Sequence, residues 1–429
     1  MSEIPVIKAA LLGAGTVGGG VLRILEWQRD EMPKKLGVSI ELKKILVRDK
    51  TKKREGIDSA LLTEDWQEIL SDPEIQIVIE VMGGIEPART YILEALRAGK
   101  NVVTANKDLL AEHGRELLDT AERAGRDLMF EAAVAGGIPI IRPLKQCLAA
   151  NHITEVMGIV NGTTNYILTR MTAEGMEFSE ALARATELGY AEADPTADIE
   201  GYDAARKVAI LASIAFNSRV TFSDVYTEGI TKITAADIRY AAELDMVIKL
   251  LGVARNTEGG IEAGVYPMLI PSSHPLASVH DAFNAVFVHG DAVDDAMFLG
   301  RGAGQLPTGS AVAGDIFEIA RNIQAGSTGK ISCTCYKNLP VKPVEEMRSR
   351  YFLRLKAEDR PGVLAGIASV FGNNNVSISQ VIQKSASGGA AELVVITDQV
   401  VERHFRDSLL VIKELSMVKE ISSVLRVYG

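Results

Sequence analysis

The amino-acid sequence predicts an α/β protein with three parts: a doubly wound parallel sheet, an α+β domain, and a C-terminal ferredoxin-like βαββαβ unit. Over roughly the first 134 residues, short apolar runs alternate with helical patterns. That regular alternation is lost from 135 to 300, and a new strand and helix pattern begins at 351. Strands that alternate with helices favour a parallel sheet, because each helix carries the chain back to the edge where the next strand starts.

The first part holds five predicted strands with helices between them. Each strand is a short apolar run bounded by turn residues. The segment PARTYILEALRAGK has apolar residues at helical spacing and ends in Ala-Gly-Lys, a typical helix stop. The predicted strands cover 6–13, 40–49, 75–83, 101–106 and 127–134, and a helix follows the first strand through VLRILEWQRD.

The middle of the chain, residues 135–300, predicts a second domain. It combines helical patterns at 179–189, 203–216 and 235–254 with β-rich pieces such as VYPMLIP and AVFVHGD. Long helices mixed with short strands, without strict alternation, are typical of an α+β domain.

The remainder of the chain divides into three segments. A glycine-rich loop that runs into a helix, 301–323, is expected to complete the first domain, 1–134. A linker at 324–350 separates off the tail, 351–429, which contains a strand, a helix, two strands, a helix and a strand. That order is the ferredoxin-like βαββαβ arrangement.

Composition favours small molecules as ligands. The net charge of −10 and the isoelectric point near 5.3 argue against nucleic acid or an anionic membrane as the main partner. No apolar run reaches the roughly 18 residues that span a bilayer, and three cysteines, Cys147, Cys333 and Cys335, are too few for a disulfide framework. We therefore expect a cytoplasmic protein, in which the C-x-C pair is interpreted as ordinary thiols, with redox or metal chemistry as the alternative.

A glycine loop follows the first strand in LLGAGTVGGG. Gly13 allows a tight turn, Gly15 permits the close approach of a pyrophosphate, and Gly18 allows the helix to pack on the strand. The helix N-terminus at Thr16 and Val17 offers backbone N–H groups to phosphates. This setting predicts a Rossmann-type dinucleotide site; a glycine turn in an α/β protein that has lost its ligand is the alternative.

The end of the second strand bears on the choice between NADP and NAD. Arg48 is placed to accommodate a 2′-phosphate, and more basic residues follow at 50–54, which favours NADP. Asp49 could instead accept a hydrogen bond from a ribose hydroxyl, so NAD remains an alternative.

A lysine follows the fourth strand in VVTANKDLL. Lys107 lies just past the carboxyl end of that strand, where ligands collect in parallel sheets, and Thr104 and Asn106 are polar neighbours. We expect a cofactor or substrate role for Lys107; a surface lysine at a helix start is the alternative.

The acidic stretch GYAEADPTADIEGYDAARK, 189–207, precedes an apolar run. It lacks the glycine spacing of a calcium loop and contains no histidine. From 203 the apolar residues surround the helix, which predicts a buried helix with Asp203 and Lys207 on one stripe, one turn apart. The residues alone leave two readings of that pair: a structural ion pair, or a catalytic acid with its orienting carboxylate.

Together these motifs resemble homoserine dehydrogenase over essentially the whole chain. The matching segments are the glycine loop, TANK, NGTTNYIL (161–168), the acidic stretch and RGAGQLPTGSAV. The tail, with EDRPGVLAGIA (358–368), resembles an ACT domain. No aspartate-kinase domain precedes these segments, so the chain resembles the monofunctional form.

The resemblance implies reversible NAD(P)H-dependent reduction of L-aspartate 4-semialdehyde to L-homoserine, in threonine, methionine and isoleucine biosynthesis. It makes Lys207 the proton donor, Asp203 the residue that orients it, and Lys107 a neighbour of both nicotinamide and substrate. The implied substrate residues are Glu192, Asp198, Tyr190, Gly189 and Thr163, and the implied cofactor residues are Gly13, Gly15, Thr16, Val17, Gly18, Arg48, Thr104, Lys107 and Gly304.

Further properties are implied by the same resemblance. A monovalent cation, Na⁺, would lie at FEAAVAGGIP, held mostly by backbone oxygens of Glu131, Val134, Gly136 and Ile138. L-threonine would bind the ACT domain near the loop 359–362, with a dimerisation module that binds no ligand as the alternative. Residues 135–300 would be the substrate-binding, catalytic and dimerisation domain, and a homodimer or homotetramer is expected. The rival readings are a catalytically silent NADP-binding amino-acid sensor and another ACT-containing hydroxy-acid dehydrogenase.

Overall fold

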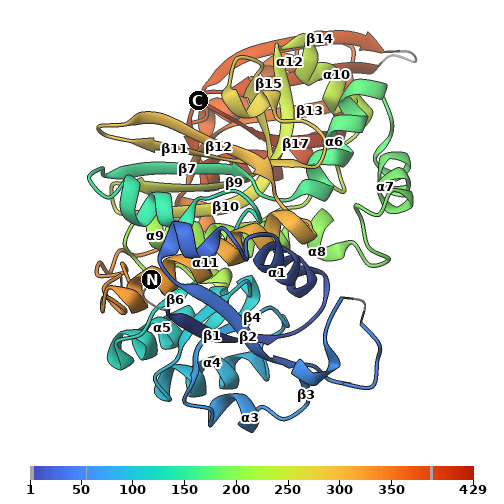
Figure 1. The fold of residues 1–429 in the computed structure, drawn as a ribbon. Coiled ribbons are helices and arrows are strands. Elements are labelled where there is room, and N and C mark those ends of the chain that lie inside the picture. The colour runs from blue at the N-terminus through green and yellow to red at the C-terminus, as the bar shows by residue number, and fades with distance from the viewer. Residues whose placement is uncertain (1–3, 55, 332, 387–389) are drawn as a thin grey trace. The chain divides into compact units, whose positions relative to one another are not determined.

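The computed structural model describes residues 4–54, 56–331, 333–386 and 390–429 (Figure 1). The chain folds into two compact units, each assembled from three stretches. Unit 1 comprises Met1–Val156, Arg206–Ser223 and Asn284–Leu339, and unit 2 comprises Met157–Ala205, Asp224–Phe283 and Pro340–Gly429.

Unit 1 contains a six-stranded sheet in the order β3-β2-β1-β4-β5-β6. All of its pairings are parallel. The predicted doubly wound parallel sheet is therefore confirmed, and its strand order reverses between β1 and β4, the switch point where ligands bind in such sheets. The strands are β1 (Val6–Leu12), β2 (Ser39–Leu46), β3 (Leu62–Thr63), β4 (Ile75–Glu80), β5 (Asn101–Thr104) and β6 (Leu128–Met129).

Helices pack on this sheet in two pairs, α1 with α11 and α4 with α5. Glycine lets the first pair touch backbone to backbone: a Cβ on Gly20 would lie 2.0 Å from the carbonyl oxygen of Gln305, and one on Gly309 would lie 2.7 Å from the carbonyl carbon of Gly20. The helices are α1 (Thr16–Trp27), α2 (Met32–Leu36), α3 (Gln67–Leu70), α4 (Ala88–Arg97), α5 (Lys107–Ala124) and α11 (Gln305–Gln324).

The strand expected at 127–134 is much shorter than predicted. Only Leu128–Met129 pairs with β5, and Glu131–Ala133 forms a 3₁₀ turn. The reason lies in Glu131, whose buried carboxylate turns away from the sheet to accept the backbone N–H groups of residues 140–142. A buried carboxylate needs such partners, and a strand cannot supply them.

Unit 2 contains a mixed sheet in the order β9-β10-β17-β13-β15-β14, with β16 beside β13 and β8 beside β10. β10 pairs in parallel with β17 and β8, whereas the pairs β9–β10, β13–β15, β13–β16, β13–β17 and β14–β15 are antiparallel. The strands are β8 (Tyr226–Thr227), β9 (Met246–Thr257), β10 (Gly260–Pro271), β13 (Arg348–Glu358), β14 (Ile378–Ala386), β15 (Ala390–Thr397), β16 (Val400–Val401) and β17 (Val418–Val427).

The tail of unit 2 has the predicted ferredoxin-like order. Its four long strands and two helices alternate as strand, helix, strand, strand, helix, strand, and the strand neighbours run β17-β13-β15-β14. The helices of unit 2 are α6 (Gly162–Glu174), α7 (Phe178–Glu187), α8 (Thr196–Ile199), α10 (Ala235–Glu243), α12 (Val363–Asn373) and α13 (Glu402–Glu414).

The prediction of one helix over 235–254 is wrong beyond residue 243. α10 ends at Glu243, Asp245 adopts a left-handed φ of 56°, and β9 begins at Met246. Along its whole length β9 pairs with β10, which buries a run of apolar residues that a helix would also have buried. Long-range pairing therefore decided between two structures that the local pattern left equivalent.

Three elements cross or adjoin the division between the units: β7 (Ile153–Ile159), α9 (Tyr202–Ala215) and β11 (Phe283–Gly290), which β12 (Asp294–Arg301) follows. The predicted buried helix at 203–216 is confirmed as α9. Its residues from Val208 to Ala215 are buried, whereas Asp203 and Lys207 are half-buried. Within the described residues, no helix is long and apolar enough to cross a membrane.

Candidate active site

The glycine loop of unit 1 has the geometry that its motif requires. Gly13 has a φ of 100°, and a Cβ there would approach the Val81 carbonyl oxygen at 3.1 Å. A Cβ on Gly18 would lie 2.3 Å from the Gly13 carbonyl oxygen, so only glycine fits between loop and helix. Gly15 has open space on the side where its Cβ would be. The loop therefore has room for a ligand beside Gly15.

The backbone N–H groups at the start of α1 lie beside Gly15. α1 begins at Thr16, its N-cap is Gly15, and no side chain caps this helix end. The first N–H groups of a helix have no partner within the helix, and the helix dipole favours negative charge there. The N-terminus of α1, at Thr16 and Val17, is therefore suited to a phosphate group.

A buried acid that the sequence reading missed supports the neighbouring strand ends. Glu80 is the last residue of β4 and is fully buried. Its Oε1 accepts hydrogen bonds from the backbone N–H groups of Met82 (2.8 Å) and Gly83 (3.1 Å). Its Oε2 accepts from the Thr104 hydroxyl at 2.6 Å. Glu80 thus shapes the loop after β4, which borders Gly13. The signal for it was an acid at the end of the largely apolar strand IQIVIE.

Thr104 and Asn106, which precede Lys107, belong to the same hydrogen-bond network as Glu80. The Thr104 oxygen also accepts from the backbone N–H of Asn106 at 3.0 Å. Asn106 caps α5 by accepting from Leu109 N–H at 3.1 Å, and its amide donates to the Gly84 carbonyl at 2.6 Å. The side chain of Thr104, predicted to contact the cofactor, is therefore buried in an internal network, and a contact with the cofactor would have to use its backbone.

The two lysines singled out in the sequence both lie in unit 1. Lys107 is the first residue of α5 and is half-buried. Its neighbour Asp108 forms an ion pair with Arg206, with 2.7 Å between Oδ1 and Nε. Arg206 directly precedes Lys207 on α9. This ion pair therefore joins the chain neighbours of both predicted catalytic lysines.

In the loop after β2, the side chains of Arg48 and Asp49 have different surroundings. Asp49 Oδ1 accepts hydrogen bonds from the backbone N–H (2.8 Å) and the hydroxyl (2.6 Å) of Thr51. These hydrogen bonds hold the pKa of Asp49 below its usual value. Arg48 is exposed at the end of the strand. Since the Asp49 carboxylate is engaged in a local turn, Arg48 is the better placed of the two to meet a ribose substituent.

In unit 2, one asparagine joins two of the predicted site acids, the substrate residue Asp198 and the orienting residue Asp203. The amide of Asn161 donates to Asp198 Oδ1 at 2.6 Å and to Asp203 Oδ2 at 3.0 Å. Its own oxygen accepts from the backbone N–H of Thr164 at 2.9 Å and so caps α6. Asn161 was not among the predicted site residues, although its N-cap position directly before a helix was visible in NGTTN.

The other predicted substrate residues lie on neighbouring segments of unit 2. The Thr163 hydroxyl donates to the Tyr190 carbonyl at 2.8 Å, and the rings of Tyr166 and Tyr190 lie 4.7 Å apart. Gly189 has a φ of 75°, and Glu192 is exposed on the loop that follows. The structure therefore brings Thr163 and Tyr190 into contact. Glu192 lies on the loop that follows Tyr190, with its side chain exposed.

The two remaining acids of the stretch, Asp194 and Glu200, flank the short helix α8. Asp194 accepts from Thr196 N–H at 3.1 Å at the start of α8. Glu200 directly follows that helix.

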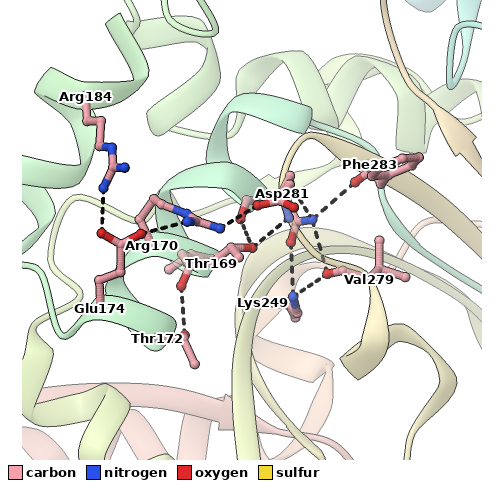
Figure 2. A network of polar contacts seen from close by, with 11 residues as sticks. Thr169, Arg170, Thr172, Glu174, Arg184, Lys249, Val279, Asp281 and Phe283 are labelled. Carbon is pink, nitrogen blue, oxygen red and sulfur yellow. Dashed lines mark hydrogen bonds and ion pairs between the residues drawn. The ribbon is translucent and has the colours of Figure 1, made fainter. Parts of the chain in front are cut away.

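Polar contacts anchor α6 to the segment 279–283, and Figure 2 shows this network. Asn165 donates to the carbonyl oxygens of Asp281 (2.9 Å) and Val279 (3.2 Å), and buried Lys249 donates to Val279 at 2.5 Å. Arg170 pairs with Asp281 at 2.6 Å, as Figure 2 shows. Burial lowers the pKa of Lys249 to about 8. These contacts fix the position of α6 and, with it, that of its N-cap residue Asn161.

The loop predicted to bind a cation is braced by hydrogen bonds. Glu131 Oε1 accepts from the backbone N–H groups of Ile140 (2.5 Å) and Ile141 (2.6 Å), and Oε2 accepts from Arg142 N–H at 2.9 Å. Ala135 and Gly136 both adopt positive φ, near 57° and 56°, which turns the backbone sharply.

The Glu131 side chain is therefore already engaged, and backbone carbonyl oxygens of Val134, Gly136 and Ile138 would be the ligands of an alkali ion. Such hard oxygens fit it. Over the described residues, no cluster of three or more His, Cys, Asp or Glu side chains could hold a metal ion.

Gly304 lies at the N-terminus of α11, in unit 1. It is the N-cap of that helix and has a φ of 128°, a conformation that L-residues with side chains rarely adopt. Because α11 packs on α1, the helix that follows the glycine loop, the loop 301–304 and the dinucleotide site belong to one unit.

Comparisons with known proteins agree in pointing to one family. Three protein-family models match the chain. The family model for homoserine dehydrogenase matches residues 139–317, and the family model for the NAD binding domain of homoserine dehydrogenase matches residues 13–131. The family model for the ACT domain matches residues 351–415. The homoserine dehydrogenase of Corynebacterium glutamicum is 49% identical over 425 residues, which cover 98% of this chain and 95% of the relative.

Solved structures agree with these matches. The crystal structure of a homoserine dehydrogenase from Thiobacillus denitrificans aligns with a TM-score of 0.94 at 42% identity, over 99% of this chain and 98% of that one. A hyperthermophilic archaeal homoserine dehydrogenase in complex with NADPH aligns with a TM-score of 0.62 at 25% identity, over 73% of this chain and 97% of that one.

Proposed function

The chain belongs to the homoserine dehydrogenase family of NAD(P)-dependent oxidoreductases, and from this we propose that it interconverts L-aspartate 4-semialdehyde and L-homoserine with Lys207 as the proton donor. The observation that carries the assignment is α9: one helix holds Asp203, bonded to Asn161, and Lys207 one turn later. Family membership argues against the other hydroxy-acid dehydrogenases, and the presence of both α9 residues argues against a silent sensor.

The mechanism assigns each group a task. The nicotinamide cofactor supplies the hydride when it is bound. As negative charge develops on the aldehyde oxygen, the Lys207 ammonium polarises the carbonyl and gives its proton to the oxygen. Asp203, one turn earlier on the same face, orients Lys207. In the reverse direction, the neutral amine of Lys207 takes the proton from the homoserine hydroxyl.

Substrate recognition would use the acids of unit 2. L-homoserine and L-aspartate 4-semialdehyde both carry an ammonium group, which carboxylates bind well. Asp198, held by Asn161, and Glu192 supply that charge, and Thr163, Gly189 and Tyr190 shape the surrounding segment. Lys107 is proposed to lie beside nicotinamide and substrate, an assignment supported by the ion pair between Asp108 and Arg206.

NADP is proposed as the preferred cofactor, with Arg48 at its 2′-phosphate. In an assay of NADP⁺ or NAD⁺ reduction with L-homoserine, Arg48→Ala is expected to raise KM for NADP⁺ about tenfold, because a charge-assisted contact is worth about 1.4 kcal/mol or more. KM for NAD⁺ should stay unchanged.

The matched control for this prediction is Lys52→Ala, which removes a charge from the same loop. It is expected to leave both KM values near wild type. An Arg48→Ala enzyme with unaltered KM for NADP⁺ would refute the assignment of Arg48, and a lack of any L-homoserine oxidation would refute the function itself.

We further propose that Na⁺ is held by the backbone oxygens of residues 131–138. The braced conformation of Glu131 and the two positive φ angles at 135 and 136 support this proposal. A cation here would fix the turn that follows the last strand of the dinucleotide-binding sheet. An assembly into a homodimer or homotetramer is also proposed, supported by Met297 and Leu299, two large apolar side chains that are exposed on β12.

The ACT domain is proposed to bind L-threonine as a feedback effector of threonine, methionine and isoleucine synthesis. The loop 359–362 lines a hollow of about 350 Å³ together with Gln383 and Leu393. Gly362 is the N-cap of α12, and no side chain caps that helix end, so its N–H groups suit a carboxylate. Asp359, whose Oδ1 lies 3.4 Å from Gln383 Nε2, suits an ammonium group.

A buried ion pair would carry the signal out of the ACT domain. Arg354 on β13 donates from Nε to Asp237 Oδ1 at 2.9 Å, and Asp237 belongs to the capping box of α10. The two side chains are 6% and 0% exposed. A buried pair of this kind is costly to break, so movement of β13 would be transmitted to α10.

Asp359→Ala is expected to raise the threonine concentration for half-maximal inhibition about tenfold, because one charge-assisted contact to the effector is lost. Turnover without threonine should not change. Asp398→Ala serves as the control. It removes an exposed acid just after the last residue of β15, whereas the loop 359–362 lies beside the first residue of that strand. This variant should be inhibited like the wild type. Inhibition that is unaltered by Asp359→Ala, or a wild type insensitive to threonine, would refute this site.

A further inference from the structure

Two cysteines in unit 1 form a pair that the proposed reaction does not use. Cys333 and Cys335 are both half-buried, and a hydrogen bond joins their thiols. They line a small cavity with Lys145, Arg219 and Phe130. Its volume of about 20 Å³ leaves room for a molecule the size of water or a small peroxide.

The surroundings of the two sulfurs differ. Arg219 Nη2 lies 3.8 Å from Cys333 Sγ, so a guanidinium faces that sulfur. Cys335 Sγ lies 3.5 Å from the Ser213 carbonyl oxygen and can donate its single proton either to that oxygen or to Cys333. The hydrogen bond from Cys335 lowers the pKa of Cys333, and the same bond together with burial raises the pKa of Cys335. Cys333 is thus the thiolate of the pair.

We propose that Cys333 and Cys335 are a site of reversible oxidation, at which a small peroxide converts the two thiols into an intramolecular disulfide with Cys333 as the attacking sulfur. The inference rests on the two adjacent sulfurs, the cation beside one of them and the cavity that admits a small oxidant. It is independent of the dehydrogenase reaction, because none of these residues has a role in it.

The chemistry balances with hydrogen peroxide as the only oxidant. The Cys333 thiolate attacks one peroxide oxygen, the O–O bond breaks, and hydroxide leaves, which gives a sulfenic acid at Cys333. The Cys335 sulfur then attacks the Cys333 sulfur, the S–O bond breaks, and the departing hydroxide takes the Cys335 proton as water. Two thiols and one peroxide thus give one disulfide and two waters, and a dithiol reductant reverses the change.

The third cysteine is an internal control, because it is the most accessible of the three. Cys147 is exposed, whereas Cys333 and Cys335 are half-buried. If exposure alone set the rate of oxidation, Cys147 would react first. If the local environment sets it, the pair reacts first, since the thiolate is the reactive form of a cysteine.

The test uses the full-length reduced protein at neutral pH. After brief exposure to a small excess of hydrogen peroxide, the free thiols are alkylated, and trypsin releases both cysteines in the peptide ISCTCYK. The expected result is that this peptide has lost two hydrogens and takes no label, while Cys147 is still alkylated. Dithiothreitol should restore two labelled thiols in ISCTCYK.

Two variants separate the roles of the sulfurs. In Cys335→Ser, oxidation is expected to stop at a sulfenic acid on Cys333, which dimedone traps. Arg219→Gln should slow the oxidation of Cys333 several-fold, whereas Cys147→Ser should leave its rate unchanged. Circular dichroism checks that the variants fold. Two alkylated thiols in ISCTCYK of the wild type after peroxide, with Cys147 oxidised, would overturn the proposal without recourse to any variant.

Discussion

Lys207→Ala is expected to lower kcat by about 10² to 10⁴, the range that a positioned general acid contributes. The half-buried ammonium on α9 is the group assigned both to polarise the aldehyde oxygen and to protonate it. Alanine keeps the helix and removes both contributions. Steady-state rates of NADPH oxidation with L-aspartate 4-semialdehyde, and of NADP⁺ reduction with L-homoserine, should fall together, because the same proton moves in both directions.

The control for this prediction separates charge from proton transfer. Lys207→Arg keeps a cation at the position, but a guanidinium does not give up its proton in proteins. It should therefore recover only the part of the rate that comes from charge. Binding of NADPH, followed by its fluorescence, and the thermal melting temperature should be close to wild type in both variants. Near wild-type kcat in Lys207→Ala would exclude Lys207 as the acid.

Much of unit 1 could be predicted from the sequence because its signals are local. The functions of Gly13, Gly15 and Gly18 follow from the absence of a Cβ, and the structure gives each of them the surroundings expected from the motif. The parallel strands are apolar runs because both of their faces are covered by helices. Residues such as Leu11 and Val78 are fully buried, and their burial could be predicted because each lies within an apolar run of the sequence.

What could not be predicted depends on partners that are distant in the chain. The hydroxyl of Thr104 is bound by Glu80, 24 residues earlier, and nothing near TANK indicates this. The carboxylate of Glu131 ends the last strand because it folds onto residues 140–142. Likewise β9 is a strand only because β10 pairs with it throughout. Local periodicity carries no information on such partners.

Asn161 is the residue for which this distinction matters most, since its partners Asp198 and Asp203 lie 37 and 42 residues away. Asn161→Ala is expected to lower kcat/KM for L-homoserine about 10- to 100-fold, because the two carboxylates lose the amide that fixes their positions, and small misplacements of substrate are costly. KM for NADP⁺ should stay unchanged, because the change is expected to act on the two carboxylates that Asn161 binds.

Asn161 also caps α6, so a loss of stability of about 1 kcal/mol has to be separated from a loss of positioning. Asn161→Ser makes that separation, because serine is a good N-cap but has no amide to bridge two carboxylates. We expect Asn161→Ser to melt close to the wild type and yet to show the lowered kcat/KM for L-homoserine of Asn161→Ala. If serine instead restored the kinetics, Asn161 would matter only as a cap, and the acids of the substrate site would be held in place by other contacts.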